Sequence, residues 1–282
     1  MAGTLFDLER IKTVARHICE AEIRDLCRGQ YLGGHEILCR CLGRYSMFLD
    51  TRDVGFAAHI IMDGFWEYWV TQFMIDTIKP GFVVLDIGAN FGYYSLLLSD
   101  LVGSQGLCFA AEPNPEAAKK LRKNLAINGF ASRSRVLPFA LGREPSGHAR
   151  FLVPTEEPKN ACVVGPEFSV TPGLDARIEH VEMTSVDAIF ANEPRIDFIK
   201  IDAEGSELNI ILGMLETLRR CRPKLLLEFN ANKDYDAELL LTTLSEVYCK
   251  PRYLDYDAIL KEINRYALFS QARVDDWMIY FE

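Results

Sequence analysis

Residues 83–95, with the sequence VVLDIGANFGYYS, pass from an apolar strand pattern into a helical pattern through a turn that contains Gly88 and Gly92. Glycine weakens both strands and helices, so two glycines here are not explained by local stability. They are explained if another group passes very close to the backbone at this turn. The sequence therefore predicts a strand–turn–helix unit whose turn lies against a nucleotide, a phosphate or another part of the chain.

From Phe82 onward, the chain alternates near-continuous apolar strands with amphipathic helices. This alternation is typical of a sheet that is covered on both faces, and it predicts a doubly wound α/β domain. The expected strands are 82–89, 106–113, 134–142, 196–205 and 223–230, and the segments 252–256 and 277–282 are expected to close the sheet. The expected helices are 93–102, 115–129, 206–221 and 236–248.

Two segments depart from this alternation. Residues 1–60 are expected to form a helical and mixed extension, with an amphipathic helix of about six turns over residues 5–26. The main domain is expected to span 61–282 and to begin with a lead-in helix over residues 64–78. Residues 143–181 interrupt the domain with several prolines and clustered charges, and this insertion is expected to hold a hairpin and a loop and to act as a lid.

The charge balance argues against some partners. The net charge of −9 disfavours a nucleic acid or an anionic membrane surface, because both require a basic protein surface. No uncharged run approaches the roughly 18 residues of a membrane span, and the acidic N-terminus does not resemble a secretory signal. The eight cysteines are scattered, which favours reduced thiols in a cytoplasmic protein.

The glycine turn falls at the carboxyl edge of the predicted sheet, where ligands bind in this fold. Gly88 would allow the sharp exit from the strand, and Gly92 would let a ligand approach the helix backbone. Glu112 follows Gly92 by 20 residues and ends the next strand. A carboxylate at that place can accept hydrogen bonds from ribose hydroxyls, so the sequence predicts a nucleotide site.

The residues around the turn favour one nucleotide over another. The spacing Gly88-x-x-x-Gly92 lacks the third glycine that a dinucleotide pyrophosphate requires. Asp86, Asn90 and Tyr93 suit a smaller amino-acid group that carries an ammonium and a carboxylate. The pattern therefore favours S-adenosylmethionine over a nicotinamide dinucleotide.

Four blocks in the chain together resemble the FkbM family of S-adenosylmethionine-dependent methyltransferases: VLDIGANFGYYSLL, AAEPNPEAAKKLRKNLAING, PFALG and IDFIKIDAEGSELNIILGM. The resemblance covers roughly residues 50–230 and implies a Rossmann-like methyltransferase sheet. It also implies methylation of a hydroxyl on a sugar, a glycolipid headgroup or a secondary metabolite. The acceptor itself does not carry over, because such families differ chiefly in their acceptors.

The resemblance implies a set of cofactor-binding residues. These are Asp86, Gly88, Asn90, Gly92 and Tyr93 at the methionine portion, Glu112 at the ribose, and Pro113, Asn114, Phe139 and Ala140 around the adenine. Glu67 of the lead-in helix either bridges to the cofactor or is a solvated helix acid beside Trp66.

A second polar group, Lys200, Asp202 and Glu204, ends the strand 196–205. The positive sulfur of the cofactor already activates the methyl group, so the enzyme mainly aligns the reactants. An alcohol must also lose its proton, and Asp202 or Glu204 is the expected base, with Lys200 fixing a neighbouring charge. His59 and His180 are alternatives for the base.

Glu228 and Asn230 end the following strand and, with Asp202 and Glu204, form an oxygen-rich group that could hold Mg²⁺. Hydrogen bonding of Glu228 to the adjacent loops is the preferred interpretation, so no metal ion is expected.

The leading hypothesis is an O-methyltransferase that acts on a small-molecule or glycan acceptor. One alternative is a nicotinamide-dependent oxidoreductase on a related fold, and another is a non-catalytic binding module that retains the cofactor fold. The N-terminal helix is expected either to cover the acceptor entrance or to form a homodimer contact.

Overall fold

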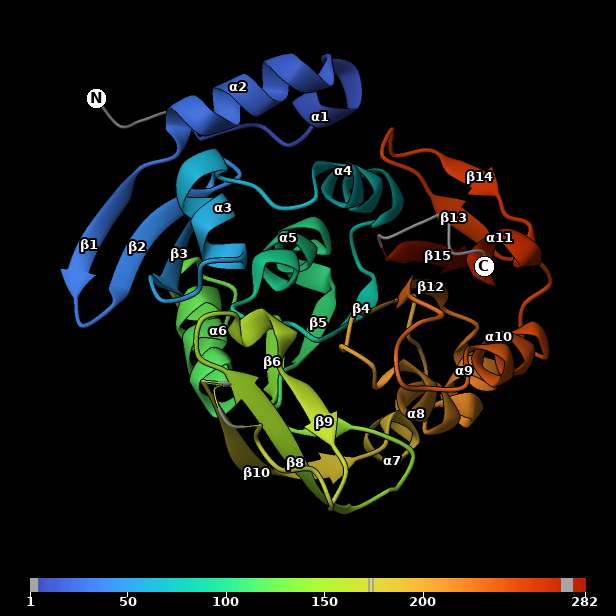
Figure 1. Cartoon of the computed structure of the whole chain (residues 1–282). Helices are drawn as coiled ribbons and strands as arrows, with labels where there is room; N and C mark the ends of the chain where they lie inside the picture. Colours follow the sequence, from blue (N-terminus) through green and yellow to red (C-terminus); the bar gives the residue numbers. More distant parts are fainter. Residues whose placement is uncertain (1–4, 172, 174, 270–275) are drawn as a thin grey trace.

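The computed structural model describes residues 5–171, 173, 175–269 and 276–282 (Figure 1). Residues 1–4 of the predicted extension, 172 and 174 of the insertion and 270–275 of the main domain lie outside these. The centre of the structure is an eight-stranded sheet in the order β14-β13-β15-β12-β11-β4-β5-β6. Its strands are β4 (Val83–Ile87), β5 (Leu107–Ala111), β6 (Ser134–Leu137), β11 (Phe198–Ile201), β12 (Lys224–Phe229), β13 (Arg252–Leu254), β14 (Leu260–Glu262) and β15 (Trp277–Phe281).

Both faces of this sheet are buried. Successive residues of a strand point to opposite faces, so Val84 packs in one hydrophobic cluster and Leu85 in the other. The first cluster includes residues of α4 (Tyr68–Thr77), α5 (Tyr93–Leu101) and α6 (Pro115–Ile127). The second includes residues of α7 (Val186–Phe190), α8 (Glu207–Leu212), α9 (Leu215–Cys221) and α10 (Ala237–Ser245). The predicted doubly wound, Rossmann-like α/β fold is confirmed.

The strand order creates a crevice at one point of the sheet edge. The chain runs outward from β4 through β5 to β6 and then returns to β11, on the other side of β4. The connections that leave β4 and β11 therefore diverge, and the gap between them opens at the carboxyl ends of these two parallel strands. Ligands bind at such a switch point in open α/β sheets.

The N-terminal extension is more broken than its pattern predicts. The expected six-turn helix is two helices, α1 (Arg10–Thr13) and α2 (Arg16–Leu26), because the backbone of Val14 is extended. A bidentate ion pair of Arg10 with Glu22 joins the two helices. A three-stranded antiparallel sheet follows, β1 (Gly29–Gly33), β2 (Glu36–Cys41) and β3 (Tyr45–Asp50), and it is held to α6 by the side-chain amide of Asn124.

The lead-in helix expected over residues 64–78 also begins later than predicted. The helix α3 (Phe56–Asp63) ends at Gly64, which has a φ of 77°. Glu67 has a φ of 36°, and α4 begins only at Tyr68. The intervening residues Trp66 and Glu67 therefore lie in a loop rather than on a helix.

The inserted segment contains the expected antiparallel hairpin, and this hairpin is part of a second sheet. Its order is β7-β10-β8-β9, with β7 (Ala140–Leu141), β8 (Gly147–Pro154), β9 (Cys162–Val164) and β10 (Ala176–Thr184), and the short helix η2 (Pro158–Asn160) precedes β9. The single strand expected over 134–142 is consequently divided between the two sheets. In Figure 1 the inserted sheet lies at the bottom of the view, and the N-terminal helices lie at the top.

A similar division affects the helix expected over 206–221, which is α8 and α9. Gly213 lies between them, and a Cβ atom there would be 1.9 Å from the carbonyl oxygen of Gly142. The remaining short elements are the 3₁₀ helix η1 (Gly103–Gln105) and α11 (Arg265–Phe269). All eight cysteines have free thiols. Among the described residues, no helix has both the length and the apolar character of a membrane span.

Candidate functional site

A cavity of about 330 Å³ opens at the carboxyl ends of β4, β5, β11 and β12. The central sheet contributes its floor. The inserted segment contributes Phe151 and Val163 from its sheet, and it contributes η2 and the following Ala161. Trp66 and Glu67, from the loop before α4, complete its lining. The switch point of the sheet, the insertion and the lead-in loop therefore meet at a single site.

The glycine turn after β4 is determined mainly by the chain's own packing. Gly88 has a φ of 81°, and a Cβ atom on it would lie 1.7 Å from the carbonyl oxygen of Asp202. Gly92 does not line the cavity, and a Cβ atom on it would be 2.5 Å from the side chain of Leu121 in α6. Gly88 and Asn90 do line it. Another chain segment therefore lies close to both glycines, and Gly88 lies at the cavity in addition.

Glu112 connects the two turns beneath the cavity. Its Oε2 accepts a hydrogen bond from the backbone N–H of Asn90 at 2.8 Å, and its Oε1 accepts one from the N–H of Asn114 at 2.8 Å. Burial raises the pKa of Glu112 to about 7 against the opposing effect of these two N–H groups. Each carboxylate oxygen has a second lone pair, so Glu112 can also accept hydrogen bonds from hydroxyls of a ligand.

The other predicted cofactor residues divide into two groups. Tyr93, Pro113, Phe139 and Ala140 line the cavity. Asp86 does not: it is fully buried, its Oδ2 accepts a hydrogen bond from the Ser95 hydroxyl at 2.6 Å, and its Oδ1 has no hydrogen-bond partner among the described residues. Asn114 also lies outside the lining, where its side chain caps the first turn of α6.

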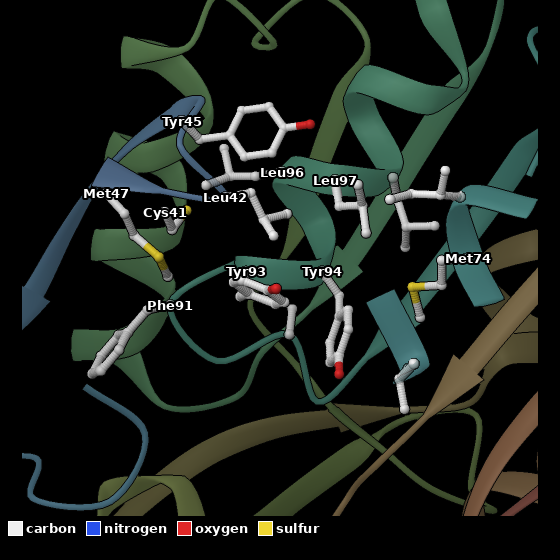
Figure 2. Packing of buried hydrophobic residues seen from close by; sticks show 14 of the residues in the cluster. Cys41, Leu42, Tyr45, Met47, Met74, Phe91, Tyr93, Tyr94, Leu96 and Leu97 are labelled. Atoms are coloured by element: carbon white, nitrogen blue, oxygen red, sulfur yellow. The ribbon is translucent and has the colours of Figure 1, made fainter. Parts of the chain in front are cut away.

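Glu67 is held at the cavity by a buried tyrosine. The hydroxyl of Tyr94 donates a hydrogen bond to Glu67 Oε2 at 2.7 Å. Tyr94 and Tyr93 lie side by side at the start of α5, with ring centroids 5.1 Å apart (Figure 2). Burial, and next the charge of Asp202, raise the pKa of Glu67 to about 7. Glu67 is therefore a cavity acid rather than a solvated one, and a carboxyl with this pKa can exchange protons near neutral pH.

The raised pKa of Glu67 predicts a pH dependence of stability. Between pH 4.5 and about 7, the Glu67 carboxyl keeps its proton in the folded protein, whereas it has lost the proton in the unfolded chain. The protonated Glu67 therefore contributes fully to stability below its ordinary pKa of 4.5, and this contribution is lost as the pH rises through about 7. Between about pH 5 and pH 7.5 we expect the melting temperature of the ligand-free protein to fall more steeply than that of Glu67→Gln. Parallel melting curves of the two proteins across this range would contradict the assignment.

Lys200 and Asp202 form a buried ion pair at the end of β11. Lys200 is only 1% exposed, and its Nζ lies 2.9 Å from Asp202 Oδ2 and 4.8 Å from the ring centroid of Tyr94. Burial alone would lower the pKa of Lys200, but Asp202 and Asp86 raise it above its ordinary value. Burial alone would raise the pKa of Asp202, but the Lys200 ammonium lowers it. Asp202 is therefore ionised and weakly basic.

Glu204 follows in a strained turn that is fixed by another acid. Its φ is 48°, and such conformations persist only where the surrounding structure enforces them. The buried carboxylate of Glu207 accepts hydrogen bonds from the N–H groups of Ala203 and Gly205, on either side of Glu204. Burial raises the pKa of Glu204, which makes it a better proton acceptor than Asp202.

The sequence interpretation missed Lys233. Its Nζ lies 2.7 Å from Glu228 Oε2 and 3.2 Å from Glu204 Oε2. Glu228 lines the cavity, whereas Asn230 does not. The sequence did contain a feature that could have indicated Lys233. It lies in the polar loop directly after β12, and β12 ends at the same sheet edge as the strand before Asp202.

The two histidines considered as bases do not line the cavity. His59 is exposed and lies 3.7 Å from Asp63, and His180 is exposed on β10. Trp66 and Phe56 line the cavity as well, so part of its wall is aromatic.

Residues 86–266 match the model of a family described as the methyltransferase FkbM domain. The hexuronic acid methyltransferase AglP of Haloferax volcanii is 25% identical over 176 residues, which are 58% of this chain and 67% of that protein. The 2-O-methyltransferase NoeI of Sinorhizobium fredii is 27% identical over 207 residues, which are 65% of this chain and 80% of that protein. A solved structure of the methyltransferase FkbM from Methylobacillus flagellatus aligns with 79% of this chain and 52% of its own, at 17% identity and a TM-score of 0.46.

Proposed function

The chain belongs to the FkbM family of methyltransferase domains, and from this premise we propose that it methylates a hydroxyl group of a sugar-containing or other small-molecule acceptor. S-adenosylmethionine is the methyl donor. The observation that supports the proposal most strongly is that Glu112 and the acids Asp202 and Glu204 line one cavity. A ribose-binding carboxylate and a proton acceptor are thereby available to the same bound pair of reactants.

The cofactor is proposed to occupy the part of the cavity next to β4, β5 and the inserted sheet. Glu112 would accept hydrogen bonds from the ribose hydroxyls, and Pro113, Phe139 and Ala140 would contact the adenine. Gly88, Asn90 and Tyr93 would lie along the methionine portion, with Glu67 at its far side. Asp86, Gly92 and Asn114, which do not line the cavity, are proposed to support these residues from behind.

When bound, S-adenosylmethionine supplies a methyl group on a positively charged sulfur. The acids of the cavity suit a cationic ligand, because their charges favour it electrostatically. Glu204 is proposed to accept the proton of the attacking hydroxyl, since its raised pKa matches that task better than the lowered pKa of Asp202. Asp202 is proposed to orient the acceptor while Lys200 compensates its charge.

A carbohydrate acceptor is proposed for two reasons. Two relatives are named as a hexuronic acid methyltransferase and a 2-O-methyltransferase. The cavity also combines the aromatic side chains of Trp66 and Phe56 with carboxylates, which can contact the apolar faces and the hydroxyls of a sugar ring. Membership of a methyltransferase family favours this proposal over a nicotinamide-dependent oxidoreductase.

The reaction is tested by incubating the protein with methyl-labelled S-adenosylmethionine and a panel of neutral and uronic acid-containing oligosaccharides. We expect one labelled methyl group per acceptor, stable to mild base, as an ether is. A label that mild base releases would identify a methyl ester and would overturn O-methylation of a hydroxyl. Cofactor binding without turnover on any acceptor would favour the non-catalytic alternative.

Glu112→Ala tests the ribose contact. The change removes the carboxylate that is proposed to accept two hydrogen bonds from the ribose hydroxyls. It also leaves the backbone N–H groups of Asn90 and Asn114 without their acceptor. We therefore expect the Kd of S-adenosylhomocysteine to rise by about 10²-fold. Titration calorimetry measures the change. Glu116→Ala is the control, because Glu116 is an exposed glutamate in the same segment. Unchanged affinity in a folded Glu112→Ala protein would remove the assignment.

A further inference from the structure

Three acids at the edge of the cavity lie close enough to bind a cation together. Asp202, Glu204 and Glu228 each offer one carboxylate oxygen, and these oxygens lie within 4.8 Å of one another. Three carboxylates at such distances repel unless a positive charge compensates them. Lys200 compensates Asp202. Burial, and next the charge of Asp202, raise the pKa of Glu228, so part of the repulsion is relieved by a proton on Glu228 and the remaining negative charge of Glu204 and Glu228 favours a second cation.

Lys233 provides that cation from the loop after β12. Its Nζ contacts Glu228 at 2.7 Å and Glu204 at 3.2 Å. The loop holds the backbone of Lys233 on both sides: its N–H donates to the carbonyl of Asn230, and its carbonyl accepts from the N–H of Tyr235. The Tyr235 hydroxyl in turn accepts the N–H of Asn230. The ammonium is thus placed by a closed turn rather than by a freely moving side chain.

We propose that Lys233 is the built-in cation of this acidic group, occupying the position that a divalent metal ion would otherwise take and positioning Glu204 for proton transfer. The role of Glu204 in proton transfer rests on the proposed function. The compensation of Glu204 and Glu228 by Lys233 does not depend on the identity of the acceptor. Lys233 is a positioning residue, since it acts through Glu204 and Glu228.

The charges around Glu204 give the proposal a measurable consequence. Burial raises the pKa of Glu204, Lys233 is the strongest influence that lowers it, Asp202 raises it, and Lys159 of η2 lowers it. Glu228 shares the ammonium of Lys233. Removal of Lys233 therefore leaves Glu204 and Glu228 without the ammonium that both carboxylates contact.

The experiment compares Lys233→Met, the wild type and Lys224→Met. Lys224 lies on β12 and pairs with Glu282 outside the cavity, so its replacement controls for the loss of a lysine. Mn²⁺ binding is measured by electron paramagnetic resonance in the absence of any acceptor. We expect Lys233→Met to bind Mn²⁺ about tenfold or more tightly than the other two proteins, because the carboxylates lose their internal cation.

Turnover is then measured with and without a chelator. We expect the chelator to leave the turnover of the wild type unchanged. The turnover of Lys233→Met is expected to be about 10²-fold lower and to recover in part when Mn²⁺ is added. The proposal would be overturned if Lys233→Met bound Mn²⁺ no better than the wild type. It would also be overturned if the chelator inactivated the wild type. Lys233→Gln replaces the methionine variant if circular dichroism shows that the latter does not fold. Tight Mn²⁺ binding without methyl transfer to any acceptor would count against the proposed function alone.

Discussion

Replacement of Glu204 by glutamine is expected to lower the turnover number by about 10²–10⁴-fold, the usual contribution of a general base. The amide has nearly the same shape but cannot take up the hydroxyl proton. The Kd of S-adenosylhomocysteine is expected to stay within about threefold of the wild type, since the proposed ribose contact is made by Glu112. Steady-state kinetics and calorimetry on the same preparation separate the two effects.

Glu216→Gln is the control for this variant, because Glu216 is an exposed glutamate on α9 that pairs with the surface residue Arg219. Asp202→Asn should behave differently from Glu204→Gln, since it leaves the ammonium of the buried Lys200 without its ion-pair partner. We expect it to reduce stability together with turnover. A Glu204→Gln protein with turnover within about tenfold of the wild type would contradict the assignment of the base.

Gly88→Ala is expected to have the largest effect on stability of any single methyl group added at the site. The new Cβ atom would lie 1.7 Å from the carbonyl oxygen of Asp202, so the ends of β4 and β11 would have to separate. The alanine would also have to adopt a positive φ. Strain of about 1–2 kcal/mol from the backbone and about 1–3 kcal/mol from overpacking predicts a loss of roughly 2–5 kcal/mol in the free energy of unfolding.

Gly81→Ala separates these two causes. Gly81 has a φ of 84°, similar to that of Gly88, but none of the other segments that the structure describes lies within 4 Å of its added Cβ atom. It should therefore lose only the backbone part, about 1–2 kcal/mol, and should retain its affinity for S-adenosylhomocysteine. Chemical denaturation of both variants measures the difference. Equal unfolding free energies, with normal cofactor affinity in Gly88→Ala, would show that the contact between the turn at Gly88 and the carbonyl of Asp202 is not as tight as described.

The doubly wound sheet could be predicted from the sequence because the residues of each strand show whether that strand is buried on one face or on both. Strands buried on both faces are apolar along most of their length, as the buried Val84, Leu85 and Ile87 of β4 and residues 225–227 of β12 show. The site edge could be predicted for the same reason, since the polar residues Glu112, Lys200 and Asp202 appear where an apolar strand stops. The periodicity of an amphipathic helix and the end of a strand are properties of one stretch of sequence. They can therefore be recognised without knowing which other segment packs against that stretch.

The misassigned element boundaries have a different origin. Residues 5–26 have helical spacing throughout, but the chain bends at Val14 so that Arg10 can meet Glu22. Residues 64–78 also look helical, but the conformation of Glu67 delays the helix and brings Trp66 to the cavity. In both places tertiary packing outweighs the weak intrinsic preference of a short helix.

The sequence by itself determined the alternation of strands and helices around the central sheet, the edge at which the polar residues gather and the methyltransferase family of the chain. Only the tertiary structure decided that Gly88 is required by the backbone of Asp202, that Asp86 lies behind the cavity and that Lys233 lies between Glu204 and Glu228. The reason is physical: burial patterns repeat along the chain and can be read locally. A steric contact or an ion pair instead depends on two segments whose separation in space is set by the whole sheet.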